Sequence, residues 1–257
     1  IVKLLLEAGA DPNTVDEDGM TPLFIAADKG HYQIVKLLLE TGDDPNTVDE
    51  DGTTPLMYAA VQGHERIMKL LLDSGADADK ANENGATPLR IAAAEGHGAC
   101  VKLLLDAGAD INKTNNIGET PLFYVIRFGT ERIMKFLIDN GADINKANEN
   151  GCTPLMVAAQ NLNPSCDRIV KLLLEAGADI NKVCVFGESP LLIAVSNRYE
   201  KCVELLIDAG ADINKASKNG CTPLIIAAEK DHVEIVKLLL DATYNDIADK
   251  VLVAVSQ

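Results

Sequence analysis

The sequence of 257 residues contains no tryptophan, and aromatic residues make up only 4% of it. Its core must therefore be built from Leu, Ile, Val and Ala, which suits small helical modules. Hydrophobic residues amount to 47% and charged residues to 24%, so the composition excludes an intrinsically disordered chain. The sequence therefore indicates a folded protein with an aliphatic core.

Positive charge is also scarce, because 23 Lys and Arg residues face 39 Asp and Glu residues, giving a net charge of −16. Nucleic acids and anionic membranes bind proteins through basic patches, so this charge argues against both as partners. It also opposes self-association and predicts a monomer. No apolar run approaches the roughly 18 residues of a membrane-spanning helix.

The six cysteines include no Cys-x-x-Cys pair, which argues against a zinc site. A disulfide framework is typical of small secreted chains rather than of a chain with a core of this size. We therefore expect free thiols in a reducing compartment, and hence an intracellular, cytoplasmic protein.

The usual catalytic motifs are missing as well: the sequence has no Gly-x-Gly-x-x-Gly, no phosphate-binding loop, no Gly-x-Ser-x-Gly and no His-Glu-x-x-His. The segment DEDG at 16–19 resembles the start of a calcium loop. However, the twelfth residue of that loop would be Ala27 instead of Glu, and Pro22 interrupts it. The sequence predicts no enzymatic activity, no cofactor and no metal.

What the sequence does contain is a 33-residue period. The units are 16–48, 49–81, 82–114, 115–147, 148–183, 184–216 and 217–246, with three extra residues in 148–183. Residues 1–15 form the second half of an earlier unit, with a helix at 1–8, and 247–257 are expected to form a C-terminal capping helix. A start within a unit suggests a piece of a longer protein. The whole chain is predicted to be one domain.

Two residue types at fixed positions predict where helices begin and end. A Thr or Ser before each Pro-Leu can cap a helix N-terminus, and the Pro suits the first helical position. These residues are Thr21, Thr54, Thr87, Thr120, Thr153, Ser189 and Thr222. A glycine follows each second helix, where a left-handed C-cap is expected. These are Gly42, Gly75, Gly108, Gly141, Gly177 and Gly210.

The histidines follow the same period. His31, His64 and His97 are 33 residues apart, and His232 lies 135 residues further on, which is four periods plus the three extra residues. Structural residues of a repeat recur in this way, whereas catalytic residues do not. We predict that all four pack at the start of the second helix of their unit.

Units such as DGTTPLMYAAVQGHERIMKLLLDSGADAD and NGCTPLIIAAEKDHVEIVKLLLDA resemble ankyrin repeats along essentially the whole chain. The resemblance implies an all-α solenoid, in which each unit has a β-turn tip and two antiparallel helices. It also implies a non-enzymatic scaffold or adaptor that binds a protein or peptide on a concave face made by the tips and first helices. The alternative is a targeting or regulatory segment of a larger protein whose catalytic or channel domain lies outside this chain.

The candidate binding residues fall into three groups on that face. The acidic tips are Asp16, Glu17, Asp18, Asp49, Glu50 and Asp51; the apolar tips are Ile117, Val185 and Phe186; and the first-helix surface positions are Phe24, Met57, Arg90, Phe123, Arg127, Phe128, Met156 and Leu192. They predict an extended partner with basic residues at one end and bulky apolar residues in the middle. Local packing of the apolar tips against neighbouring turns is the alternative.

Two further features of the sequence remain open. The asparagines of the GADIN segments resemble sites of asparaginyl hydroxylation in ankyrin repeats, or they are structural residues of the turn. They are Asn112, Asn145, Asn181 and Asn214. The insertion NLNPSCDR at 161–168 is either a contact site or a neutral lengthening of a loop.

Overall fold

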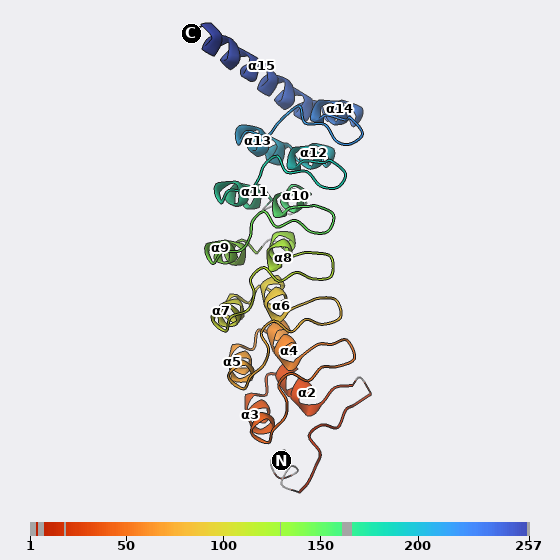
Figure 1. The fold of residues 1–257 in the computed structure, drawn as a ribbon, viewed down its shortest axis with the longest axis vertical. Helices are drawn as coiled ribbons and strands as arrows, with labels where there is room; N and C mark the ends of the chain where they lie inside the picture. Colours follow the sequence, from red (N-terminus) through yellow and green to blue (C-terminus); the bar gives the residue numbers. More distant parts are fainter. Residues whose placement is uncertain (1–3, 5–7, 18, 129, 161–165, 256–257) are drawn as a thin grey trace. The chain divides into compact units, whose positions relative to one another are not determined.

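The computed structural model describes residue 4 and residues 8–17, 19–128, 130–160 and 166–255, with the side chains of the last helix described to Tyr244. The chain divides into two compact units, Ile1–Val125 and Ile126–Gln257, which we describe separately. Within the described residues there are fourteen α-helices and no β-strand (Figure 1). The predicted all-α class is confirmed.

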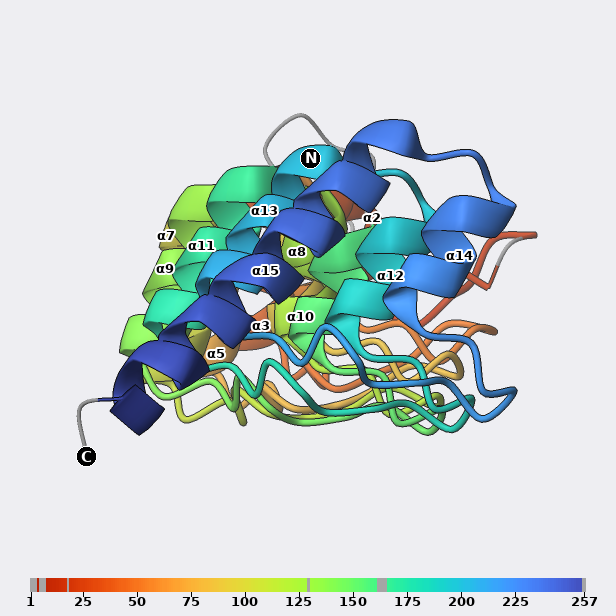
Figure 2. The same cartoon turned by 90° about the horizontal axis from the view of Figure 1, so that it is seen from above.

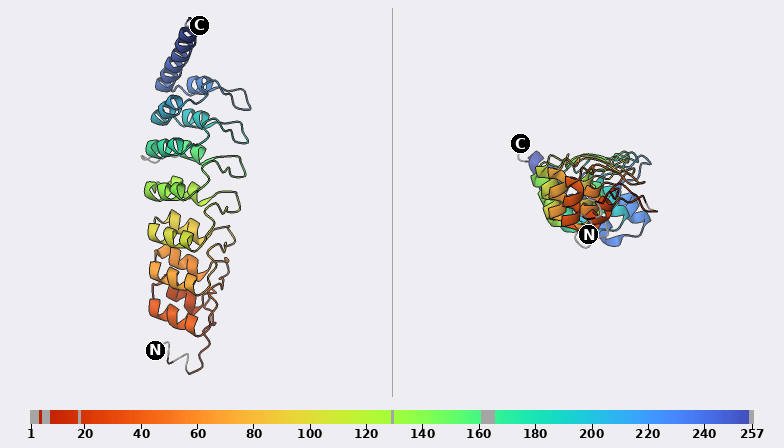
Figure 3. Two further views of the ribbon diagram at one scale, coloured as in Figure 1. Left: turned by 60° about the vertical axis from the view of Figure 1, so that its left-hand side comes forward. Right: turned by 90° about the horizontal axis from the view of Figure 1, so that it is seen from below.

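Unit 1 is built from repeats, and each repeat contributes a pair of helices, called here the first helix and the second helix. Its helices are α2 (Pro22–Asp28), α3 (Tyr32–Glu40), α4 (Pro55–Gln62), α5 (Glu65–Asp73), α6 (Pro88–Ala94), α7 (Gly98–Asp106) and the first part of α8 (Pro121–Phe128). The first helices α2, α4 and α6 contact one another in series, and the second helices α3, α5 and α7 do the same. Long loops leave the unit on the side of the first helices (Figure 3).

Unit 2 repeats this arrangement. It contains the end of α8 and then α9 (Glu131–Asp139), α10 (Pro154–Gln160), α11 (Cys166–Glu175), α12 (Pro190–Ser196), α13 (Glu200–Asp208), α14 (Pro223–Glu229) and α15 (Val233–Val255). The first helices α10, α12 and α14 form one row, and α11, α13 and α15 form the other (Figure 2). From α10 to α15, each helix therefore packs against the other helix of its own repeat and against a helix of a neighbouring repeat.

The predicted helix caps are present in five of the seven repeats. The hydroxyl oxygens of Thr54, Thr87, Thr153, Ser189 and Thr222 accept a hydrogen bond from the backbone N–H three residues later. The prediction is wrong for Thr21, which makes no such bond, and for Thr120, whose buried hydroxyl has no hydrogen-bond partner within the described chain. All six predicted C-cap glycines have φ between +89° and +101°, which confirms the left-handed helix ends.

The C-terminal capping helix is a second correction, because α15 continues from Val233 to Val255 without the predicted break at residue 246. In the segment LLLDATYN, Thr243 stands where the segment LLLDAGAD has Gly108. A β-branched residue does not adopt the left-handed conformation that ends the other helices. Instead, the Thr243 hydroxyl donates to the carbonyl oxygen of Leu239 at 2.8 Å, and the helix goes on. Most of the expected N-terminal helix at 1–8 and residues 161–165 of the insertion lie outside the described residues.

Candidate protein-binding surface

Several loop tips owe their shape to the polar residue that begins them. The Asp49 carboxylate accepts hydrogen bonds from the N–H groups of Asp51 and Thr53, at 3.0 and 2.8 Å. Asn82, Asn115 and Asn148 make the same pair of bonds in their own loops. An Asp or Asn that bonds to its own loop backbone fixes a tight turn. The side chains at these four tips are thus presented by a rigid backbone.

The first helix also holds the tip in unit 1. The Tyr58 hydroxyl on α4 donates to the second carboxylate oxygen of Asp49 at 2.7 Å. Burial of the phenol, followed by its hydrogen bond to Asp49, raises the pKa of Tyr58 well above its usual value near 10. Both carboxylate oxygens of Asp49 are consequently occupied by hydrogen bonds within the repeat, and the residue is only half-exposed.

Neighbouring tips are joined by backbone hydrogen bonds. In unit 1 the N–H of Glu83 donates to the carbonyl oxygen of Asp51 at 3.0 Å. In unit 2 the N–H of Val185 donates to the carbonyl oxygen of Asn150 at 2.9 Å. The N–H of Lys218 donates to the carbonyl oxygen of Phe186 at 3.2 Å. The tip of 184–187 is therefore fixed to the loops on both sides.

The asparagines of the GADIN segments join the next turn. In unit 2 the side-chain oxygen of Asn145 accepts from the N–H of Asp179 at 2.8 Å. The side-chain amide nitrogen of Asn145 donates to the carbonyl oxygen of Gly177 at 3.3 Å. Asn181 accepts from the N–H of Asp212 at 2.9 Å. The structural role of these two residues is therefore established. Hydroxylation of Asn112, Asn145, Asn181 and Asn214 stays a prediction.

Three of the four histidines bind the backbone of the preceding repeat. A ring nitrogen of His64 lies 2.9 Å from the carbonyl oxygen of Asp28. A ring nitrogen of His97 lies 3.0 Å from the carbonyl oxygen of Val61, and a ring nitrogen of His232 lies 3.0 Å from the carbonyl oxygen of Val195. The structural role predicted for them is confirmed. Within the part of the chain that the structure describes, no three His, Cys, Asp or Glu side chains gather as a metal site.

The acidic tips lie in unit 1 as expected. Asp16, Glu17, Glu50 and Asp51 are exposed, and Asp18 lies outside the described residues. Glu83, which sequence reasoning missed, is exposed on the next tip of the same unit.

Most of the first-helix positions predicted to be exposed are buried. Phe24, Met57, Phe123, Met156 and Leu192 are only 0–1% accessible. The reason is visible at Phe24, whose ring meets the ring of Tyr58 in the next repeat edge to face, with centroids 5.8 Å apart. The position faces the neighbouring repeat instead of solvent. These five residues belong to the core, so the prediction that they are exposed binding residues is wrong.

Arg90 occupies the same position and is half-buried. Its guanidinium carbon lies 4.3 Å from the centroid of the Tyr124 ring, a cation–π contact. Its Nε atom is buried without a hydrogen-bond partner among the described residues. Arg90 therefore replaces an apolar side chain in the inter-repeat packing.

The remaining apolar candidates are exposed. Ile117 is 52% accessible and Phe128 is 61% accessible, while Val185 and Phe186 on one tip of unit 2 are 44% and 63% accessible. Arg127 is also exposed. This exposure argues against local packing of these side chains. Cys184 begins the tip of Val185 and Phe186 in place of the usual Asp or Asn, and it is buried.

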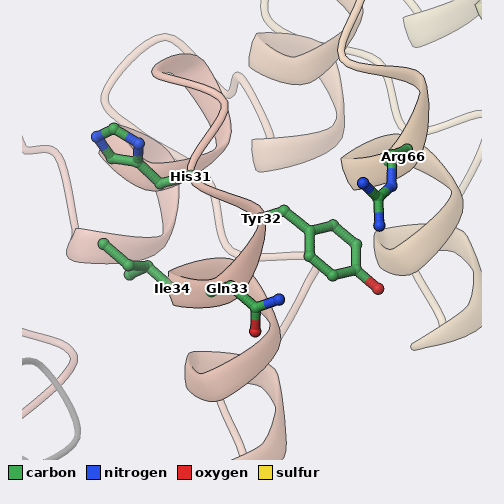
Figure 4. A pocket seen from close by; sticks show the side chains of 5 residues that line it. All are labelled: His31, Tyr32, Gln33, Ile34 and Arg66. Atoms are coloured by element: carbon green, nitrogen blue, oxygen red, sulfur yellow. The ribbon is translucent and has the colours of Figure 1, made fainter.

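One shallow pocket that sequence reasoning missed lies on the second helices of unit 1 (Figure 4). Its lining residues are His31, Tyr32, Gln33, Ile34 and Arg66. The guanidinium carbon of Arg66 lies 4.8 Å from the centroid of the Tyr32 ring. His31 points away from this pair (Figure 4).

The comparisons with known proteins decide the family. The family model for ankyrin repeats, which spans three copies, matches residues 1–82, 41–115, 92–184 and 165–250. The chain belongs to the ankyrin repeat family. Ankyrin repeat domains are generally protein–protein interaction modules, and their fold is a non-catalytic interaction fold.

Two solved ankyrin repeat domains are similar over most of this ankyrin chain. The human ASB11 ankyrin repeat domain has 29% sequence identity and a TM-score of 0.73, with 87% of this chain and 98% of that chain covered. The ankyrin repeat domain of Bcl-3, a member of the IkappaB protein family, has 27% identity and a TM-score of 0.76, with 86% and 100% covered. No curated protein sequence matches significantly. Among the described ankyrin helices, none is long and apolar enough to cross a bilayer.

Proposed function

We propose that this ankyrin repeat chain is a non-enzymatic scaffold that binds partner proteins or peptides through its loop tips. The observation that carries this proposal is the exposure of Val185 and Phe186 on a tip whose backbone is bonded to both neighbouring loops. A large apolar side chain held in water by a rigid backbone loses little conformational freedom when a partner covers it. Phe186 has the character of a binding anchor.

The acidic tips of unit 1 form a second, separate contact region. Four exposed carboxylates, on Asp16, Glu17, Glu50 and Asp51, favour a partner segment rich in Lys or Arg. Association through this region should become slower as salt concentration rises, because the attraction between opposite charges is screened. Binding through the apolar tip should depend much less on salt.

Affinity purification with variants of the 257-residue chain tests the proposal. The double variant Val185→Ala with Phe186→Ala should lose a defined set of captured proteins. Tyr244→Ala is the matched control, because Tyr244 is an exposed aromatic residue on α15, away from the tips, and is 74% accessible. For a partner captured by the wild type, Phe186→Ala should weaken binding by more than about 1 kcal/mol. Equal capture by the double variant and by the control would contradict the proposal.

The acidic region is tested in the same way. Glu50→Gln with Asp51→Asn should slow association, whereas Asp73→Asn, an exposed carboxylate on α5, should leave the rate unchanged. The alternative role, a targeting segment for a catalytic or channel domain outside this chain, would use the same tips. It differs in predicting that the partner alters the activity of that other domain.

A further inference from the structure

Three loop tips of unit 2 share one turn geometry. In each of them the first residue donates its N–H to the carbonyl oxygen of the fifth, at 2.9 Å in the tip 148–152, 3.1 Å in 184–188 and 3.0 Å in 217–221. These loops follow one another along one edge of the unit, before α10, α12 and α14 (Figure 1). Residues at the same place in the three tips can therefore be compared directly.

The hydrogen bonds between these tips join four exposed residues in series. Val185, the second residue of its tip, donates its N–H to the carbonyl oxygen of Asn150, the third residue of the tip before it. Lys218 donates in the same way to the carbonyl oxygen of Phe186. The side chains of Glu149, Val185, Phe186 and Lys218 are exposed. We call these four residues the tip row of unit 2.

The side chain of Lys218 lies beside the apolar tip. Its Cγ atom is 3.0 Å from the place where a Cβ on Gly187 would stand, so its aliphatic part rests on the residue that follows Phe186. The same place in the tip is exposed at Glu50 and Glu149, although a following tip is bonded to each of their tips. Exposure is therefore a property of this place in the tip.

Charge changes sign along the tip row. Glu149 lies on one side of the apolar pair Val185 and Phe186, and Lys218 lies on the other side. In unit 1 no tip has a cation at this place. The residues there are Glu17, Glu50, Glu83 and Asn116.

Other charged residues near the apolar tip leave this order unchanged. Lys182 is exposed and Glu188 is half-buried on the loop of the tip itself, and their charges are opposite. The Lys215 ammonium donates to the carbonyl oxygen of Asn181 at 3.0 Å. The sign of the charge on each side of the apolar pair is therefore set by Glu149 and Lys218.

We propose that the tip row binds an extended partner segment in which a bulky apolar side chain lies between a basic and an acidic residue. This inference rests on the proposed function, because it specifies which segment the apolar tip accepts. The apolar side chain covers Phe186, the basic residue faces Glu149 and the acidic residue faces Lys218. Apolar contact supplies the affinity, and the two charges select the segment and the direction in which its charges run.

A display library of peptides with a fixed Leu-Phe centre and randomised residues on both sides tests the proposal on the 257-residue chain. The wild type should enrich peptides with Lys or Arg on one side of the centre and Asp or Glu on the other. Lys218→Glu should enrich peptides with basic residues on both sides, and Glu149→Lys peptides with acidic residues on both sides. The two changes in one chain should restore the mixed preference. For synthetic peptides of each class, one repelled charge should weaken binding about fivefold.

The exchanged residues fit their new places, because the same turn position already holds Glu at 149 and Lys at 218. Unchanged thermal unfolding checks that the variants fold. Lys171→Glu is the matched control, since the Lys171 side chain is 67% exposed on α11 and its reversal changes the net charge as Lys218→Glu does. This control should keep the mixed preference.

The outcomes separate this inference from the proposed function. If Phe186→Ala abolishes peptide binding while Lys218→Glu and Glu149→Lys leave the preferred charges unchanged, the apolar tip binds but the inferred charge order is wrong. The inference also fails if Lys171→Glu shifts the preference as Lys218→Glu does, because net charge alone would then decide. A library that yields no peptide dependent on Phe186 would overturn both the inference and the proposed function.

Discussion

A ring nitrogen of His64 lies 2.9 Å from the carbonyl oxygen of Asp28, which belongs to the preceding repeat. The imidazole also fills the space beside Gly30, where an added Cβ would come within 2.9 Å of the ring. One side chain thus bonds to its neighbouring repeat and requires a glycine there.

We expect His64→Ala to lower the free energy of unfolding by about 1 kcal/mol, because the carbonyl of Asp28 loses its partner. Urea denaturation of both proteins measures this. His31→Ala is the matched control, and its effect should stay within about 0.5 kcal/mol because His31 is exposed. Equal losses in the two variants would show that the inter-repeat bond contributes nothing.

Phe123→Ala and Phe186→Ala should differ sharply in stability. Phe123 is 0% accessible, so its truncation opens a cavity and should cost roughly 3–5 kcal/mol. Phe186 is 63% accessible, so its truncation should change stability by less than about 0.5 kcal/mol. Chemical denaturation distinguishes the two, and only Phe186→Ala is a clean test of binding.

The hydroxyl of Tyr58 should make stability fall in alkali. Burial and the bond to Asp49 raise the pKa of Tyr58 in the folded protein, whereas the unfolded phenol ionises near pH 10. Below pH 10 both states are protonated and the contribution is complete. Above it, the unfolded state ionises first and stability is lost. The unfolding free energy of Tyr58→Phe, measured by denaturation between about pH 9 and pH 11, should fall less steeply than that of the wild type. Parallel curves would contradict this explanation.

Thr243→Gly should shorten α15. Glycine at this position restores the left-handed helix end found at Gly108, where φ is +90°. We expect faster amide hydrogen exchange after residue 243 and a lower helical signal in circular dichroism. Thr243→Ala is the control, because alanine favours the helix interior and should leave exchange slow. Unchanged exchange in the glycine variant would mean that packing, and not residue 243, determines the helix end.

The repeat pattern was enough to predict the helix pairs, the glycine ends and the role of the histidines, because each depends on the chain within one repeat and its neighbour. It was not enough to predict the direction of Phe24 or Leu192. A first helix is packed on both sides by neighbouring repeats, so an apolar residue there faces a neighbour even when the helical period suggests solvent. Ile225 has the same place in its repeat and is exposed, which shows that burial here depends on the neighbour and not on the residue. The uninterrupted helix α15 is explained by one residue, Thr243, which stands where other repeats have a glycine that ends the second helix.

The hydrogen bond from the N–H of Lys218 to the carbonyl oxygen of Phe186 has a consequence for the evolution of this surface. The tip is positioned through main-chain atoms, so the side chains at 185 and 186 can be exchanged without rebuilding the loop. Recognition of a new target would then require changes at two codons, while the architecture that presents them is inherited intact.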